Sequence, residues 1–199
     1  MKSKAIQRQL RERHGGATDA QMLAAVCRSA NGLSKFARAA TSHDEFVIAR
    51  IQERVDEVEA ERPRAVFPVW DSRAFTPGLY GISEWGYLHT SRQILALSTF
   101  ARLVGKLETA AMSLDPELRG GVRLLLGLAL GRLTDTMAST CRWVVGTPER
   151  GGSFIAGANG GEKHMRWLAD FAEANPLSGE TGSWNNQLNW VVRVIKNLA

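Results

Sequence analysis

The chain has 199 residues, 44% of them hydrophobic and 23% charged, with a formal net charge of +5 and a pI of about 9.6. This composition is typical of a soluble globular protein with a buried core, and its positive charge is compatible with a polyanionic partner. No stretch approaches the roughly 20 apolar residues of a membrane helix, and the start MKSKAIQRQLRERHGG lacks the apolar segment of a signal peptide. We therefore exclude a membrane helix and expect a cytoplasmic protein.

The residues that usually build metal or nucleotide sites are not spaced for such chemistry. Cys27 and Cys141 lie far apart in apolar surroundings, which predicts buried free thiols and no disulfide framework. The sequence has no CxxC pair, no HxxxH or HExxH spacing, and no GxSxG, Walker or GxGxxG element. We therefore predict no metal site and assign no catalytic residue.

The N-terminal part begins with a basic segment and two short apolar runs. Residues 1–14 alternate basic and polar side chains and predict a charged helix that ends at Gly15-Gly16. Periodicity does not distinguish strand from helix for Met22–Cys27. The turn signal Asn31-Gly32 favours a strand there, which pairs with residues 35–39.

A clearer helical pattern begins at Ser42, which forms a predicted capping box with Glu45. This helix is expected to end at Pro63. Residues 64–89 then combine prolines and glycines with many aromatic side chains, so we expect an irregular segment that packs over a core or lines a cleft. The apolar stripe of the predicted helix consists of Val47, Ile48, Ile51, Val55 and Val58.

Two longer helices are predicted in the middle of the chain. Thr90 and Gln93 form a second capping box, which begins a helix to about Met112. Asp115 and Pro116 provide an N-cap and a proline at the first helical position, and this helix is expected to reach about Val145. It is apolar on nearly every side, which predicts a central, buried helix. Its small residues Gly127, Ala129 and Gly131 are expected to let neighbouring helices approach closely.

Two more helices are predicted on either side of the loop NPLSGETGSW. Residues 162–174 predict a helix, and the residues Asn175, Pro176, Ser178 and Gly179 stop it. Ser183 is expected to cap the last helix. The apolar face of the first helix consists of Met165, Leu168, Ala169 and Ala172, and that of the last helix of Leu188, Val191, Val192 and Ile195.

These elements predict a mainly α fold, a helical bundle with a small β element near the N-terminus. We divide the chain into a basic and amphipathic helical segment with short strands, residues 1–63, and a helical domain, residues 64–199. An internal repeat is not evident in the sequence.

Three polar groupings are candidates for function. The first runs from Tyr80 and Trp85 to Arg92 and Gln93, where a cation in the first helical turn opposes the helix dipole. Arg92 is therefore expected to pair with either an acidic partner or an internal carboxylate. The second is Cys141-Arg142-Trp143, suited to a phosphate contact or a structural ion pair. The third is the loop that precedes Trp184, and all three are open to a clamping role or a direct functional role.

These three groupings lie in segments that resemble one family, the adenine-specific DNA methylases that contain a zinc ribbon and often accompany anti-phage defence genes. The segment YGISEWGYLHTSRQILALSTF is similar to the family pattern YGMTxWGDLFTPRQLLALTTF. LALGRLTDTMASTCRW is similar to LALDRLADYNSSLCRW, and LADFAEANPLSGETGSW is similar to WDFAEVNPFSGSSGSW. The resemblance covers most of residues 18–199 and makes 64–199 a methylase-like domain.

The resemblance also shows which motifs of the family are missing from this sequence. In the family, a glycine-rich motif that binds S-adenosylmethionine lies upstream of this region, and the catalytic Asp-Pro-Pro-Tyr lies downstream. This chain contains neither motif and no zinc-ribbon cysteines. Adenine methylation needs the flipped base to be held at such a turn, so we expect no turnover and no cofactor binding from this chain alone. The DNA-binding residues implied are Arg92, Gln93, Arg142, Tyr80, Trp85 and Trp184, with the arginines on phosphates.

Three functions follow from these observations. The chain is part of a DNA adenine methyltransferase, the helical region beside the catalytic sheet, and its partners are DNA and the remaining parts of the enzyme or another subunit. Alternatively, it is a non-catalytic module that is derived from such an enzyme and binds DNA or a protein. The third hypothesis is a helical scaffold without a nucleic-acid role.

Overall fold

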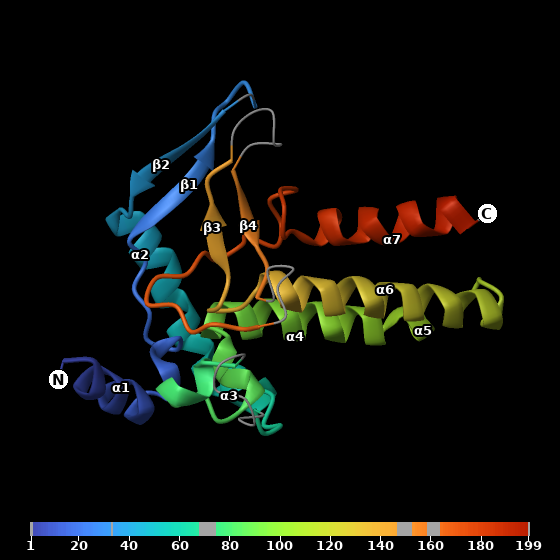
Figure 1. Cartoon of the computed structure of the whole chain (residues 1–199). Helices are drawn as coiled ribbons and strands as arrows, with labels where there is room; N and C mark the ends of the chain where they lie inside the picture. Colours follow the sequence, from blue (N-terminus) through green and yellow to red (C-terminus); the bar gives the residue numbers. More distant parts are fainter. Residues whose placement is uncertain (1, 33, 68–74, 147–152, 159–163, 199) are drawn as a thin grey trace.

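The computed structural model describes residues 2–32, 34–67, 75–146, 153–158 and 164–198. Figure 1 shows a long arm of helices, with the N-terminal helix and two hairpins gathered away from its tip. None of the helices in these ranges combines the length and apolar character that a membrane crossing requires. The arm consists of α4 (Ser91–Gly105), α5 (Leu107–Ala110), α6 (Pro116–Thr136) and α7 (Trp184–Leu198).

The predicted N-terminal helix is confirmed as α1 (Lys2–Glu12), which is followed by the 3-10 turn η1 (His14–Gly16). Gly15 and Gly16 have φ values of 84° and 81°, in the left-handed region that favours glycine. A Cβ on Gly15 would lie 2.6 Å from Ile82 Cγ1. The glycine pair therefore ends the helix and also lets the turn approach the core.

The predicted β element is confirmed as a hairpin of β1 (Ala24–Arg28) and β2 (Lys35–Ala39). The strands are antiparallel, with Val26 opposite Ala37 and Arg28 opposite Lys35. The residues of both strands are exposed or half-buried, so this hairpin contributes no core of its own.

The helix predicted from Ser42 to Pro63 is broken into α2 (Ser42–Ala49), the 3-10 segment η2 (Arg50–Arg54) and α3 (Val55–Glu61). The capping box also lies one residue earlier than predicted. The extended backbone of Thr41 places its Oγ1 on the Asp44 N–H, and its own N–H donates to Asp44 Oδ2 at 2.8 Å.

The single apolar stripe predicted for this helix is wrong. The 3-10 segment has three residues per turn and changes the phase of the side chains. Val58 is therefore 1% exposed, whereas Val47 is 52% exposed.

The described part of the aromatic segment 64–89 is irregular, as predicted, with the 3-10 turns η3 (Pro77–Tyr80) and η4 (Trp85–Leu88). Residues 68–74 fall outside the described ranges. Gly81, with a φ of 100°, lets this segment touch α1, because a Cβ there would lie 2.4 Å from Arg11 Cα. The segment supplies most of the hydrophobic core cluster of Phe67, Ile82, Leu88 and Met165.

The capping box of Thr90 and Gln93 is confirmed at the start of α4. The helix ends at Gly105, earlier than predicted. The N–H of Lys106 bonds to both Arg102 O and Val104 O, which tightens the last turn before the short α5.

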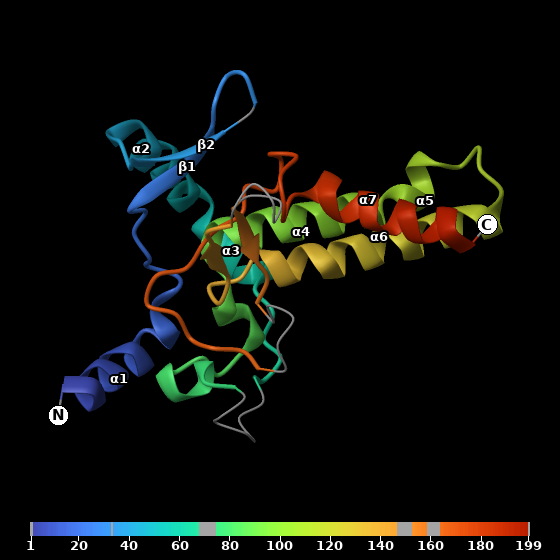
Figure 2. The same ribbon diagram turned by 45° about the horizontal axis from the view of Figure 1, so that its top comes forward.

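The predicted cap of α6 is confirmed, since Asp115 Oδ1 accepts from the N–H groups of Glu117 and Leu118. The prediction of a central, buried helix is wrong. Ala129 and Leu133 are fully buried on one side, but Leu124 is 67% exposed on another. The reason is that α4 and α7 cover only part of the helix surface (Figure 2).

The region after α6 also differs from its prediction. The helix ends at Thr136, and Arg142–Val144 forms the strand β3, which pairs with β4 (Phe154–Ala156) in an antiparallel hairpin. The predicted helix over 162–174 is wrong over its described residues, 164–174, which are irregular and contain no helix. Tertiary hydrogen bonds replace helical ones there, because the Trp167 N–H donates to Thr76 Oγ1 and the Ala172 N–H donates to Cys141 O.

The last predicted helix is confirmed as α7, which begins immediately after Ser183. Its predicted apolar face is only partly covered. Val191 is 9% exposed, whereas Val192 and Ile195 are 37% and 41% exposed. Over its described residues the chain is thus mainly helical, with two small antiparallel sheets of which the second was not predicted.

Candidate functional site

The loop 175–183 is shaped by its own polar side chains. Asn175 Oδ1 accepts the N–H of Leu177 at 2.9 Å, and Ser178 Oγ donates to Asn175 O at 2.9 Å. Ser178 Oγ also accepts the N–H of Glu180 at 3.2 Å. Gly179 has a φ of 75°, which allows the chain to reverse. These contacts give Asn175, Ser178 and Gly179 a structural role in the turn.

The end of the loop fixes α7 against α4. Ser183 Oγ accepts the N–H of Asn186 at 3.3 Å, and Pro176 O accepts the N–H of Trp184 at 2.8 Å. The Trp184 ring stacks on Phe100 of α4 with a centroid distance of 4.8 Å and an interplanar angle of 20°. One face of Trp184 is therefore occupied within the fold.

Gly182 connects the same loop to α6. Thr136 Oγ1 donates to Gly182 O at 3.3 Å. Gly182 has a φ of 88°, and a Cβ on it would lie 3.1 Å from Ala174 Cβ and 3.3 Å from Thr136 Cβ. A side chain at position 182 would therefore combine backbone strain with a tight contact.

The charge of Arg92 is satisfied by an internal carboxylate. Its Nε and Nη2 donate to Glu173 Oε1 and Oε2 at 2.9 and 2.7 Å, in a half-buried bidentate pair. Thr90 Oγ1 also lies 3.4 Å from Glu173 Oε1. Of the two roles that the sequence left open for Arg92, the structure shows the internal ion pair. Gln93, also among the predicted DNA-binding residues, is fully buried within the capping box.

His89 and Arg62 hold the segment in front of α4. His89 Nδ1 lies 2.6 Å from Met137 O, and burial lowers the pKa of its imidazole, so the neutral ring donates this hydrogen bond. The buried Arg62 guanidinium donates to Gly86 O at 2.7 Å, to His89 O at 3.1 Å and to Glu59. Sequence reasoning missed Arg62, because its local pattern indicates only a helix end.

The other predicted DNA-binding residues are two aromatic side chains that pack within the fold and one exposed arginine. Tyr80 stacks on Trp167 with a centroid distance of 4.3 Å, and Trp85 makes an edge contact with Phe67 at 4.9 Å. Trp85 nevertheless remains 36% exposed. Arg142 is exposed on β3.

The three family-like segments thus form one hydrogen-bonded junction. The first and second are joined by the Ser139 N–H, which donates to Leu88 O at 2.6 Å. The second and third are joined by the Ala172 N–H, which donates to Cys141 O at 2.9 Å. The first and third are joined by the Arg92–Glu173 ion pair. We call this set of contacts the three-segment junction.

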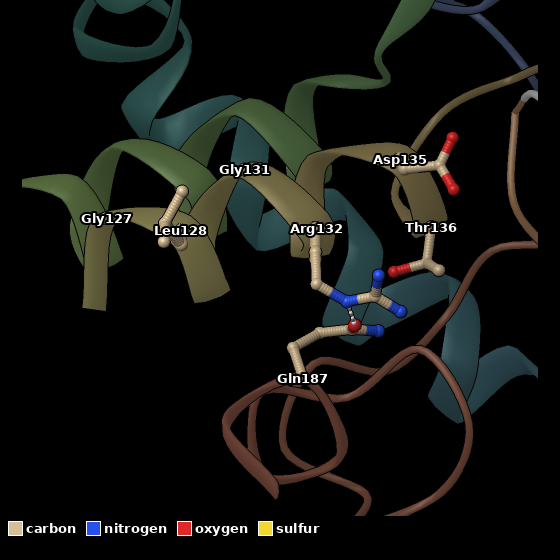
Figure 3. A pocket seen from close by; sticks show the side chains of 7 residues that line it. All are labelled: Gly127, Leu128, Gly131, Arg132, Asp135, Thr136 and Gln187. Carbon is tan, nitrogen blue, oxygen red and sulfur yellow. Dashed lines mark hydrogen bonds between the residues drawn. The ribbon is translucent and has the colours of Figure 1, made fainter. Parts of the chain in front are cut away.

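A groove of about 420 Å³ lies beside the junction, between α6 and α7 (Figure 3). At its base Arg132 Nε donates to Gln187 Oε1 at 3.1 Å, and the same guanidinium lies 5.7 Å from the Trp190 ring centroid. The groove brings together the Arg132 guanidinium, the Asp135 carboxylate and the Leu128 side chain. Sequence reasoning missed it, because it expected this side of α6 to be buried. Its lining consists of Gly127, Leu128, Gly131, Arg132, Asp135, Thr136 and Gln187.

The described ranges contain no parallel sheet. Nucleotide-like cofactors in α/β enzymes are held in a crevice at the carboxyl ends of parallel strands. The described strands form two separate antiparallel pairs, which offer no such crevice. The groove between α6 and α7 is formed by helices alone.

The cysteines and the acidic side chains show no reactive arrangement in the described ranges. Both cysteines are free, Cys141 is buried, and burial raises the pKa of its thiol to about 12. Cys27 is half-buried, so only one of the two predicted buried thiols is fully enclosed. No group of three or more His, Cys, Asp or Glu side chains in the described ranges is placed to hold a metal ion.

Comparison of the chain with protein families, with characterised proteins and with solved structures finds no match.

Proposed function

We propose that the chain is the helical part of a DNA adenine methyltransferase, placed beside the catalytic sheet, and that methyl transfer requires the rest of the enzyme. The observation that carries the proposal is the three-segment junction. Segments that resemble one family, and that lie far apart in the sequence, contact one another around the starts of α4 and α7 and the end of α6. Their common role is then to fix these helices relative to each other.

Exposed apolar side chains on the helical arm support a role as part of a larger assembly. Leu124 and Leu128 of α6 and Val194 of α7 are each more than half exposed. Large exposed apolar surfaces are uncommon on monomeric proteins and often mark interfaces. In the proposed enzyme, this surface packs against the part that carries the catalytic sheet.

The test measures methyl transfer to duplex DNA by the chain, by a polypeptide that carries the cofactor-binding and Asp-Pro-Pro-Tyr motifs, and by their mixture. We expect turnover in the mixture to exceed that of either component. Glu173→Ala, which removes the ion pair with Arg92 from the junction, should lower the turnover of the mixture. Glu108→Ala removes an exposed carboxylate paired with Arg123 on the arm and should leave it unchanged. A mixture no more active than its components would contradict the proposal.

DNA binding without catalysis is the second candidate. It is favoured by the cationic β1–β2 hairpin, whose strands carry Arg28, Lys35 and Arg38. This function predicts salt-dependent binding of duplex DNA together with an inactive mixture. Arg142→Ala should weaken this binding if β3 also contacts phosphates.

A further inference from the structure

The β1–β2 hairpin has an unbalanced charge. Residues 20–40 contain Arg28, Lys35 and Arg38 and no aspartate or glutamate. Arg28 and Lys35 are opposite each other in the register, so they lie on the same face of the hairpin. Two carboxylates from outside the hairpin offset part of this charge, since Arg38 pairs with Asp44 and the other two cations share Glu180.

Both cations on this face converge on one carboxylate from the loop. Arg28 Nη1 lies 2.6 Å from Glu180 Oε1, and Lys35 Nζ lies 2.9 Å from Glu180 Oε2. Their spacing therefore matches a single oxyanion, and a phosphate offers the same kind of acceptor. The side chains of Arg28, Lys35 and Glu180 are 59%, 30% and 29% exposed, so solvent and ligands reach them.

The shape of the hairpin suits a groove of duplex DNA. A two-stranded ribbon fits the major groove, which is about 12 Å wide. Five-residue strands extend for about 17 Å. Figure 2 shows the hairpin projecting away from the helical arm. Its polar ties to the C-terminal half include the ion pairs with Glu180 and the bond from Lys35 Nζ to Ser153 O. The contact with Glu180 thus attaches the hairpin to the loop 175–183.

We propose that the hairpin binds duplex DNA and that a DNA phosphate replaces the Glu180 carboxylate on Arg28 and Lys35. Glu180 is then a built-in competitor, which lowers affinity for isolated anions and favours a ligand that presents many phosphates. Duplex DNA as this ligand rests on the proposed function. The roles of Arg28, Lys35 and Glu180 go beyond it.

The test measures binding of a short fluorescein-labelled DNA duplex by fluorescence anisotropy at several salt concentrations. Arg28→Ala and Lys35→Ala should each weaken binding by about fivefold and should lower the salt slope by about 1. Glu180→Gln should strengthen binding by several-fold. Stronger DNA binding by Glu180→Gln would show that Glu180 competes with phosphate, because loss of a purely structural contact would weaken DNA binding or leave it unchanged.

Matched variants control for net charge and folding. Glu108→Gln and Arg123→Ala change the same charges on the helical arm and should leave affinity close to that of the unaltered chain. The double variant Arg28→Ala, Glu180→Gln should keep only part of the gain of Glu180→Gln, because Lys35 is released but Arg28 is missing. Circular dichroism and thermal unfolding show whether each variant is folded.

Two results would overturn the inference. One is unchanged or weaker binding in a folded Glu180→Gln variant, and the other is binding that does not respond to Arg28→Ala or Lys35→Ala. The methyl-transfer mixture tests the proposed function separately. If the mixture is inactive but Glu180→Gln still strengthens DNA binding, the methyltransferase proposal is contradicted and the proposal of a DNA-binding hairpin is supported. If the mixture is active but the hairpin variants do not change DNA binding, the hairpin proposal is contradicted and the methyltransferase proposal is supported.

Discussion

Single residues determine how closely the loop 175–183 approaches the helical arm. At Gly182 the backbone is left-handed, and a Cβ added there would make tight contacts with the Ala174 and Thr136 side chains. At Gly179 the backbone is also left-handed, with a φ of 75°, but no described atom lies within 4 Å of a Cβ added there. The two positions therefore separate backbone strain from steric contact.

Gly182→Ala should destabilise the chain by about 2–3 kcal/mol, because left-handed strain of about 1–2 kcal/mol adds to the forced contact with Ala174. Gly179→Ala should cost only the strain, about 1–2 kcal/mol. Urea unfolding followed by circular dichroism measures both values. Equal losses at the two positions would show that contact at Gly182 contributes nothing.

At the scale of elements, α6 has two different surfaces. Its buried side carries Ala129 and Leu133, whereas its glycines face open space, with no described atom within 4 Å of a Cβ added at Gly120, Gly127 or Gly131. The close approach of neighbouring helices predicted at Gly127 and Gly131 does not occur within the described fold, whereas Ala129 is fully buried. These glycines lower helix stability without a packing contact that compensates for it.

Gly127→Ala should raise the free energy of unfolding by about 1 kcal/mol, because alanine has the higher helix propensity and its methyl group meets no neighbour. Gly120→Ala, on the same helix but outside the groove, is the matched control and should stabilise to a similar extent. Thermal unfolding of the two variants checks this. A destabilised Gly127→Ala alone would mean that the groove side of α6 is packed in solution.

At the scale of the whole molecule, buried and paired ionisable groups make stability depend on pH in two windows. Burial lowers the pKa of His89 from its ordinary 6.5, so the unfolded chain takes up a proton that the folded chain excludes. Glu59 and Glu180 have pKa values below their ordinary 4.5, through hydrogen bonds with Arg62 and Lys35 respectively. Their stabilising contribution is present above that value and is lost as the pH falls.

Stability should therefore begin to fall as the pH drops below about 6.5, and a second loss should follow below about 4.5. His89→Asn keeps a donor near the position of Nδ1 for Met137 O but cannot titrate. Its unfolding free energy, measured by urea denaturation from pH 7.5 to 3.5, should lack the upper window and keep the lower one. Identical pH profiles for both chains would exclude His89 as the origin of the upper window.

The extent of the correct sequence predictions follows the range of the interactions involved. The hairpin, the Asp115 cap, the Thr90–Gln93 capping box and the Ser183 cap were all predicted, because their signals lie within a few residues. The irregular path of residues 164–174 was not predicted, because its backbone N–H groups bond to Thr76 and Cys141, which lie far away in the sequence. The partner of Arg92 was predicted only in part. Its position in the first turn of a helix indicated an acidic partner, but the sequence did not identify Glu173 as that partner.

The sequence by itself determined the β1–β2 hairpin, the starts of α4, α6 and α7, and the side chains that cap these three helices. Those features depend on local backbone preferences and on hydrogen bonds between near neighbours. Only the tertiary structure decided that residues 173–184 join α4, α6 and the β1–β2 hairpin to the start of α7, through Glu173, Gly182, Trp184 and Glu180. Such contacts depend on how distant segments pack together, and the spacing of residues along the chain does not encode that arrangement in any local pattern.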